Sequence, residues 1–124
     1  MRTFTALAAT ASALAFVTPA AGAADYGSGL RCYEYNDFGC ALSNWMPLAM
    51  NGMTRAQYRI GSFYAEGTGV PVDMAEAYKW FSLAAAKGDR TSMEALESIT
   101  PTMSRAQLEE GMRRAQEAGL RRRY

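Results

Sequence analysis

The sequence contains no histidine, and that absence removes much of the common catalytic chemistry. Without an imidazole, a chain has no Ser-His or Cys-His nucleophilic system and no histidine-based zinc site. The sequence also lacks the Ser-x-x-Lys motif, which excludes the usual penicillin-recognising nucleophile. An excess of one charge is missing too, because 13 basic residues stand against 12 acidic ones. We therefore predict no catalytic residues, no metal site and no cofactor, and no nucleic acid or anionic membrane as partner.

Long apolar runs are scarce, and the one present lies at the start of the chain. Arg2 precedes a stretch of Ala, Leu, Phe and Val that continues to Val17, and small residues follow it. This pattern predicts a secretory signal over residues 1–23, with cleavage near Ala23. The run is shorter than the roughly 20 residues of a membrane helix. We expect a periplasmic or secreted protein, and an uncleaved anchor is the alternative.

Cysteine is also scarce, with Cys32 and Cys40 as the only two. An exported chain meets an oxidising compartment, where an even number of cysteines favours pairing. The two residues lie on either side of Asn36, and a turn there would place them opposite each other on adjacent helices. We predict a disulfide between them; two free thiols in a core are the alternative.

The remaining residues, 24–124, fit one small domain, and part of this segment repeats. Residues 37–52 recur in character at residues 73–88. Their apolar positions recur every three or four residues, which is typical of a helix with one buried face. The matched positions are Asp37/Asp73, Phe38/Met74, Ala41/Ala77, Leu42/Tyr78, Trp45/Phe81, Leu48/Ala84, Ala49/Ala85 and Gly52/Gly88.

Helix starts are marked by Ser, Thr or Asp followed three residues later by Glu or Gln, a pair that satisfies the first free backbone donors. Gly52 and Gly88 lie where helices should stop. No segment after residue 23 shows the pattern of a strand. The four predicted capping pairs are Thr54/Gln57, Asp73/Glu76, Thr91/Glu94 and Ser104/Gln107. These signals predict an all-α chain with helices over residues 26–35, 38–51, 54–66, 73–87, 91–99 and 104–118.

The middle of the chain resembles a known helical repeat. The motif consists of Ala56-Gln57-Tyr58-Arg59-Ile60-Gly61-Ser62-Phe63-Tyr64, Gly67-Thr68-Gly69-Val70-Pro71, Asp73, Ala77, Trp80 and Ala84-Ala85-Ala86-Lys87-Gly88. It is similar to the Sel-one-like repeat family, which is related to the tetratricopeptide repeats. On this resemblance the domain divides into a degenerate repeat over residues 25–52, a complete repeat over 53–88, a partial repeat over 89–100 and a capping helix over 102–119.

The resemblance implies a fold and a general role. The fold is a short right-handed solenoid of antiparallel helix pairs, which must stack because one pair cannot bury its apolar faces alone. Gly61 would let the paired helices approach closely, and Tyr64 with Phe81 would fill the space between them. The implied role is that of an adaptor or scaffold whose concave side holds a protein or peptide. Some secreted members of the family carry a disulfide at the junction between one repeat and the next. The two cysteines of this chain lie at a different position in the repeat, so the binding and hydrolytic properties of those members are not expected for it.

Analogy with tetratricopeptide arrays also suggests a binding surface on the first helix of the complete repeat. Arginine and aromatic side chains are frequent anchors at protein interfaces. We predict a protein or peptide partner in the cell envelope, with no stable membrane insertion, and leave the oligomeric state open. The candidate binding residues are Arg55, Tyr58, Arg59 and Ser62.

The sequence leaves two alternative functions, a hydrolase and an assembly factor. A cell-envelope hydrolase acting on β-lactams or peptidoglycan-related material would need an acid and base pair, such as Glu94 with Glu97 or Glu109 with Glu110. Residues one apart do not face each other on a helix, and a solvated face is the simpler interpretation. A small assembly factor that works by oligomerising is the second alternative.

The remaining patterns concern packing and surface charge. In the last predicted helix, Leu108, Met112 and Ala115 are expected to face inward. Arginines 121–123 are expected to form a solvated terminus, and contact with an acidic partner is the alternative. Core packing is predicted for the methionines Met46, Met50, Met53, Met74, Met93, Met103 and Met112. Outward ion pairs are predicted for Glu109/Arg113, Glu110/Arg114 and Glu117/Arg121.

Overall fold

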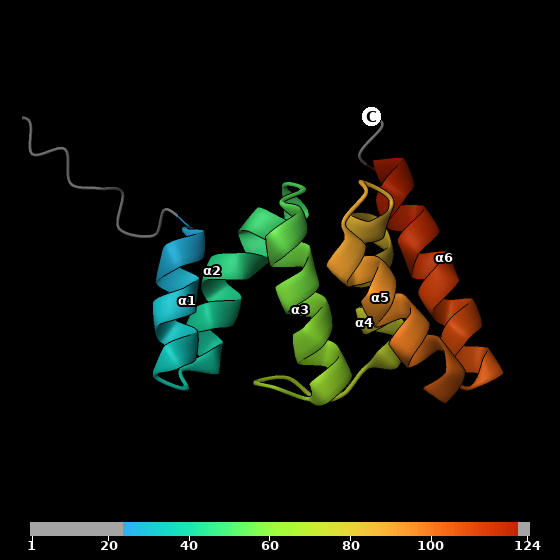
Figure 1. Ribbon diagram of the computed structural model, residues 1–124, viewed down its shortest axis with the longest axis horizontal. Coiled ribbons are helices and arrows are strands. Elements are labelled where there is room, and N and C mark those ends of the chain that lie inside the picture. Colours follow the sequence, from blue (N-terminus) through green and yellow to red (C-terminus); the bar gives the residue numbers. More distant parts are fainter. Residues whose placement is uncertain (1–23, 122–124) are drawn as a thin grey trace, which may run out of the picture.

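The computed structural model describes residues 24–121, and every regular element within that range is a helix. Figure 1 shows the helices side by side, from α1 at one end of the molecule to α6 at the other. The predicted signal over residues 1–23 and the arginines at 122 and 123 lie outside the described residues. The elements are α1 (Tyr26–Glu34), α2 (Phe38–Met50), α3 (Thr54–Glu66), α4 (Met74–Ala85), α5 (Arg90–Ile99), the 3₁₀ turn η1 (Thr100–Thr102) and α6 (Arg105–Arg121).

The helices form a short solenoid in which consecutive helices from α1 to α5 pack against one another and α6 packs on α4 (Figure 1). Helix α1 packs on α2, and α3 packs on both α2 and α4. Helix α4 also contacts α5 and α6. The predicted all-α solenoid is confirmed, and the observed helix bounds agree with the predicted ones to within a few residues.

The repeat predicted from sequence is visible in the packing of α2 and α4. Ala41 and Trp45 of α2 are fully buried, and their counterparts Ala77 and Phe81 of α4 are buried as well. The same small and aromatic positions therefore face inward in both helices. The central core consists of Ala41, Trp45, Ala49, Ala56, Ile60, Phe63 and Trp80, with Tyr64 packed against it.

Two glycines allow an aromatic ring of the second helix to lie against the backbone of the first. A Cβ atom added to Gly61 would lie 2.7 Å from Cδ1 of Phe81, and one added to Gly29 would lie 2.2 Å from Nε1 of Trp45. Real Cβ atoms do not approach other atoms so closely, so any larger residue would push the helices apart. The close approach predicted at Gly61 is confirmed, and Gly29 plays the same part in the first pair. Phe81 is paired with Tyr58, at 5.7 Å between ring centroids.

The prediction that methionines fill the core is wrong for several of them. Alanine and aromatic residues occupy the inward stripe, so that in α2 the inward position is taken by Ala49 and the next residue, Met50, is 65% exposed. Because the helices approach closely at alanine and glycine positions, little inward space is left for long thioether side chains. The other exposed methionines are Met53, Met93 and Met112.

Of the four predicted capping pairs, Ser104/Gln107 is confirmed in full and Asp73/Glu76 is confirmed for the Asp73 side chain alone. The side chain of Asp73 accepts a hydrogen bond from the backbone N–H of Glu76 at 3.0 Å. Ser104 and Gln107 form the complete reciprocal pair, in which the Gln107 N–H donates to Ser104 Oγ at 3.1 Å and the Ser104 N–H donates to Gln107 Oε1 at 2.9 Å.

The other two capping pairs are wrong, each for a packing reason. Gln57 does not cap α3, because its side chain is fully buried and Nε2 donates to the Ala49 carbonyl oxygen at 3.0 Å. Helix α5 begins before Thr91, with Asp89 as its N-cap. A carboxylate is as good a cap as a hydroxyl, so the earlier residue takes the position.

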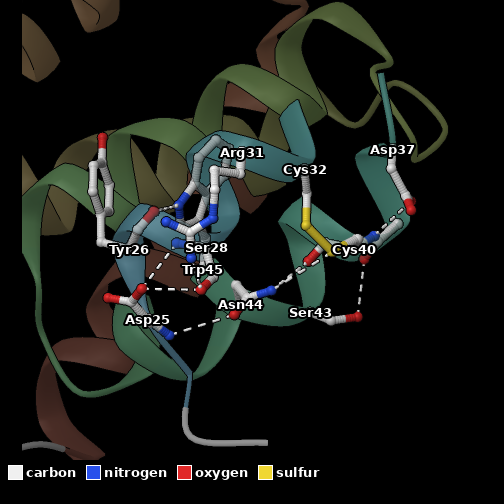
Figure 2. Close-up of a disulfide and its surroundings, with 11 residues drawn as sticks. Asp25, Tyr26, Ser28, Arg31, Cys32, Asp37, Cys40, Ser43, Asn44 and Trp45 are labelled. Carbon is white, nitrogen blue, oxygen red and sulfur yellow. Dashed lines mark hydrogen bonds between the residues drawn. A yellow bond between two sulfur atoms is a disulfide. The ribbon is translucent and has the colours of Figure 1, made fainter. Parts of the chain in front are cut away.

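A disulfide joins α1 to α2 and confirms the predicted pairing of Cys32 with Cys40. Their Cα atoms are 5.6 Å apart across a tight turn in which Asn36 has a φ of 58°. Figure 2 shows the sulfur atoms between the two helices, and Asp25 capping the start of α1 near Asn44 of α2. The bridge therefore fixes α1, the shortest α-helix of the described residues, to α2.

Helix α6 packs along α4 with a face that differs in part from the predicted one. Gly111 is buried, and a Cβ atom there would lie 2.9 Å from Cβ of Tyr78. Leu108 and Ala115 are half-buried as expected, whereas Met112 is 54% exposed. The inward stripe centres on the glycine because α4 presents a bulky tyrosine at the point of contact.

The ion pairs of α6 also differ from the prediction. Only Glu110 with Arg114 is present among the three predicted pairs, at 2.9 Å. Glu109 pairs with Arg105, while Arg113 pairs with both Glu110 and Glu117. Long arginine side chains reach carboxylates three or four residues away in either direction, so spacing alone does not select the partner.

Candidate binding surface

A hollow of about 200 Å³ lies on the side of the solenoid formed by α1, α3 and the start of α5. We call it the tyrosine–arginine hollow. Three of the four candidate binding residues line it, all from α3. Its lining consists of Tyr26, Arg55, Tyr58, Arg59, Asp89 and Thr91.

Arg55 lies over an aromatic ring of the neighbouring pair. Its guanidinium carbon is 4.8 Å from the centroid of the Tyr26 ring. That ring is itself supported by Trp45 at 5.7 Å, and the Trp45 indole N–H donates to the Tyr26 carbonyl oxygen at 3.1 Å. The exposed arginine is thus held against a fixed ring by a cation–π contact.

Arg59 is held more firmly, by three aromatic side chains. Its Nε donates to the Tyr26 hydroxyl at 3.2 Å. Its guanidinium carbon lies 5.5 Å from the Trp45 ring centroid and 5.7 Å from that of Tyr33. This packing fixes the plane of the guanidinium group and uses only one of its three nitrogens for a hydrogen bond.

Neither of these arginines has an acidic partner in the described chain. None of the ion pairs formed within residues 24–121 involves Arg55 or Arg59. Asp89 is the acidic residue of the lining, and its Oδ2 accepts hydrogen bonds from the Ser92 N–H at 3.0 Å and from Ser92 Oγ at 2.5 Å. Two positive charges therefore face one carboxylate that is engaged in capping α5.

Tyr58 and Ser62 occupy different positions relative to the hollow. Tyr58 is half-buried and lines it, with its ring packed on Phe81. Ser62 lies one turn further along α3, and its Oγ donates to the Tyr58 carbonyl oxygen at 3.0 Å. The structure therefore brings Arg55, Tyr58 and Arg59 together and leaves Ser62 outside the lining.

Sequence reasoning missed Tyr26 and Asp89 as lining residues. A signal for Tyr26 exists, because Tyr26-x-x-Gly29 recurs as Tyr58-x-x-Gly61. The offset between these two motifs is shorter than the offset between α2 and α4, because the loop within the first helix pair is shorter than the loop within the second. No comparable signal marks Asp89, which enters the hollow only because α5 stacks beside α3.

A larger hollow of about 500 Å³ lies on the other helices, α2, α4 and α6. Met46, Met50, Trp80, Leu83 and Ala118 supply its apolar lining. Its charged lining consists of Glu76, Lys79, Arg114, Glu117 and Arg121.

Most charges of this larger hollow are already paired. Glu76 receives a hydrogen bond from the Trp80 indole at 3.1 Å and forms ion pairs with Lys79 and Arg114. Arg114 also donates to Asp73 at 3.1 Å. Burial alone would raise the pKa of Asp73, but hydrogen bonds from the Glu76 N–H and from Arg114 hold that pKa below its usual value. The contacts of Arg114 join α4 to α6, so we assign Arg114 and Glu76 to packing.

Over residues 24–121, no group of three or more His, Cys, Asp or Glu side chains is placed to hold a metal ion. Within the same range, no helix has the length and apolar character needed to cross a membrane.

Comparison with known proteins identifies the complete repeat. Residues 54–89 match the family model of the Sel1 repeat, and this segment spans α3, α4 and the loop between them. Comparison with curated proteins and with solved structures gives no significant match. The match covers the glycine and aromatic contacts that join α3 to α4, together with all three arginine and tyrosine side chains that α3 contributes to the hollow. Residues 54–89 are therefore similar to a Sel1 repeat, and they are set in a short helical solenoid.

Proposed function

We propose that this protein is an exported interaction module that binds a protein or peptide through the tyrosine–arginine hollow. Sel1 repeats generally mediate protein–protein interaction, which supports the first part of the proposal. The observation that carries the second part is the pair Arg55 and Arg59, which are oriented by aromatic rings and have no acidic partner within residues 24–121.

Preorganisation is the physical reason to favour this surface. An arginine that is already fixed loses little conformational freedom when it binds, so more of the contact energy appears as affinity. Arginine and tyrosine are also the residue types that carry most of the binding energy in interfaces. The hollow, at about 200 Å³, is smaller than typical small-molecule sites and fits one or two side chains of a partner.

Export to an oxidising compartment is the third part of the proposal. The disulfide between Cys32 and Cys40 is compatible with such a compartment, where bridges of this kind persist. The proposal includes no catalytic step, and the module acts by holding its partner. The expected location is the periplasm or the exterior of the cell.

The proposal is tested by capture of the partner from the cell envelope with the purified protein as bait. Arg55→Ala combined with Tyr58→Ala should abolish capture. The matched control is Arg105→Ala with Met112→Ala, which removes an exposed arginine and an exposed apolar side chain from α6. If the α3 variant captures the same protein as the wild type, the assignment of the surface is wrong.

A further inference from the structure

We infer that the tyrosine–arginine hollow takes an acidic peptide segment, with a glutamate or aspartate carboxylate on Arg59 and Arg55 and a neighbouring apolar side chain against Tyr26 and Tyr58. This inference rests on the proposed function and adds the chemistry of the partner. It follows from the charges, the fixed geometry of Arg59 and the nature of the rings.

The charge of the hollow is positive on the α3 side. Arg55 and Arg59 both contribute to its lining, and Asp89 is the acidic residue there. Both hydrogen bonds accepted by the Asp89 carboxylate come from Ser92 at the start of α5, where the helix dipole offsets part of the negative charge. Thr91 is neutral, so the field across α3 attracts an anion.

The geometry of Arg59 suits a carboxylate in particular. Because Nε donates to the Tyr26 hydroxyl, the two terminal nitrogens remain to meet a ligand. Their parallel N–H bonds match the two oxygens of a carboxylate in an end-on bidentate pair. Trp45 and Tyr33 hold the guanidinium plane, so this donor pair is in place before binding.

The two tyrosines explain why a peptide is favoured over a simple anion. Tyr26 and Tyr58 present rings beside the arginines, and rings of this kind accept apolar or aromatic side chains. A nucleic acid would need many more positive charges along a track, whereas this hollow has two arginines and an opposing carboxylate. An acidic residue next to an apolar one satisfies both features of the lining.

The test uses three blocked octapeptides built on glycine and serine, each with one phenylalanine. The first also carries two glutamates, the second two glutamines and the third two lysines. Affinity for the purified protein is measured by NMR chemical-shift titration. We expect the glutamate peptide to bind at least about tenfold more tightly than the glutamine peptide, as charge-assisted hydrogen bonds require. The lysine peptide should bind most weakly, and added salt should reduce the difference between the peptides.

Three variants locate the effect. Arg59→Gln should weaken the glutamate peptide about tenfold and leave the glutamine peptide nearly unchanged. Arg55→Gln should act in the same direction, and because Arg55 is exposed this variant keeps the test valid if Arg59→Gln fails to fold. Asp89→Asn should tighten binding by about two- to threefold, since asparagine still caps α5 while the opposing charge is removed. Arg105→Gln, on the exposed face of α6, is the control and should change nothing.

The outcomes separate this inference from the proposed function. Equal affinity for the glutamate and glutamine peptides, or weaker binding in Asp89→Asn, would overturn the acidic-peptide inference. So would an oligothymidylate that binds as tightly as the glutamate peptide, because charge alone would then explain the attraction. If the natural partner is still captured in a manner that depends on Arg55 and Tyr58, the proposed function stands without this inference. If capture is independent of both residues, the proposed function fails first.

Discussion

Arg114 of α6 donates from Nη1 to Oε2 of Glu76 on α4 at 3.0 Å, and the same nitrogen donates to Asp73 at 3.1 Å. One arginine thus ties the last described helix to the N-terminal turn of α4. The side chains of Arg114 and Glu76 are 30% and 17% exposed, so this ion pair is partly shielded from water. Helix α6 is therefore held by a charged contact as well as by the packing of Gly111 on Tyr78.

Replacement of this arginine should loosen α6. We expect Arg114→Met to lower the free energy of unfolding by about 1 to 2 kcal/mol, because Asp73 and Glu76 then lose a partly buried partner. Urea denaturation measures the change. Arg105→Met is the matched control, since that side chain is 93% exposed and its surface ion pair should contribute less than about 0.5 kcal/mol. Equal effects of the two variants would contradict a special role for Arg114.

Stability should fall in acid through the carboxylates of this region. Hydrogen bonds from Arg113 and Arg114 lower the pKa of Glu110 from 4.5 to about 2. A pKa that is lower in the folded state gives a contribution that is complete above pH 4.5 and is lost as the pH falls toward 2. Asp73 acts in the same direction, because its pKa is also below the usual value.

This pH dependence is checked by thermal melting at pH 7, pH 4.5 and pH 2.5 at constant ionic strength. The melting temperature should change little between the first two conditions and drop at the third. Glu110→Gln should show a smaller drop, since the substituted side chain does not titrate. An identical drop in Glu110→Gln would show that Glu110 contributes nothing to the acid sensitivity.

The close approach of α3 and α4 predicts opposite effects for two glycine substitutions. Gly61→Ala should destabilise the fold by about 1 to 3 kcal/mol, because the added Cβ would lie 2.7 Å from the ring of Phe81. Gly119→Ala, in α6, meets nothing within 4 Å and should be neutral or stabilise by up to about 1 kcal/mol. Chemical denaturation of both variants tests the difference in sign.

Loss of the disulfide should weaken the first helix pair. Cys32→Ser with Cys40→Ser should lower the free energy of unfolding by about 2 to 3 kcal/mol, as the chain-entropy model gives for a loop this short. A reductant should reproduce the loss in the wild type and have no effect on the double variant. Because Tyr26 belongs to α1, the double variant should also bind the glutamate peptide more weakly than the wild type does.

Much of the fold was predictable from particular residues. The recurrence of Ala41 and Trp45 as Ala77 and Phe81 predicted which faces of α2 and α4 are buried, because helical periodicity is a local property of the chain. The disulfide was predictable for the same reason, since its two cysteines flank one turn. The capping role of Thr54 was predicted wrongly because its expected partner, Gln57, is buried and donates to the Ala49 carbonyl oxygen. That of Thr91 was predicted wrongly because Asp89 is the N-cap of α5.

The candidate site was predictable only in part. The analogy with tetratricopeptide arrays selected Arg55, Tyr58 and Arg59 on α3, and the structure places all three in one hollow. It did not select Tyr26, which orients both arginines and comes from another helix pair. The position of a residue from a neighbouring repeat depends on how the repeats stack, and the sequence motif of a single repeat carries no information about that stacking.

The sequence by itself determined the helices, the inward stripe of the repeat and the pairing of the two cysteines, because each depends on residues close together in the chain. Tertiary structure alone decided that α6 meets α4 at Gly111 and Arg114, and that Tyr26 and Asp89 join the arginines of α3. These contacts join residues from different helix pairs, and they depend on how far and at what angle those pairs are offset when they stack.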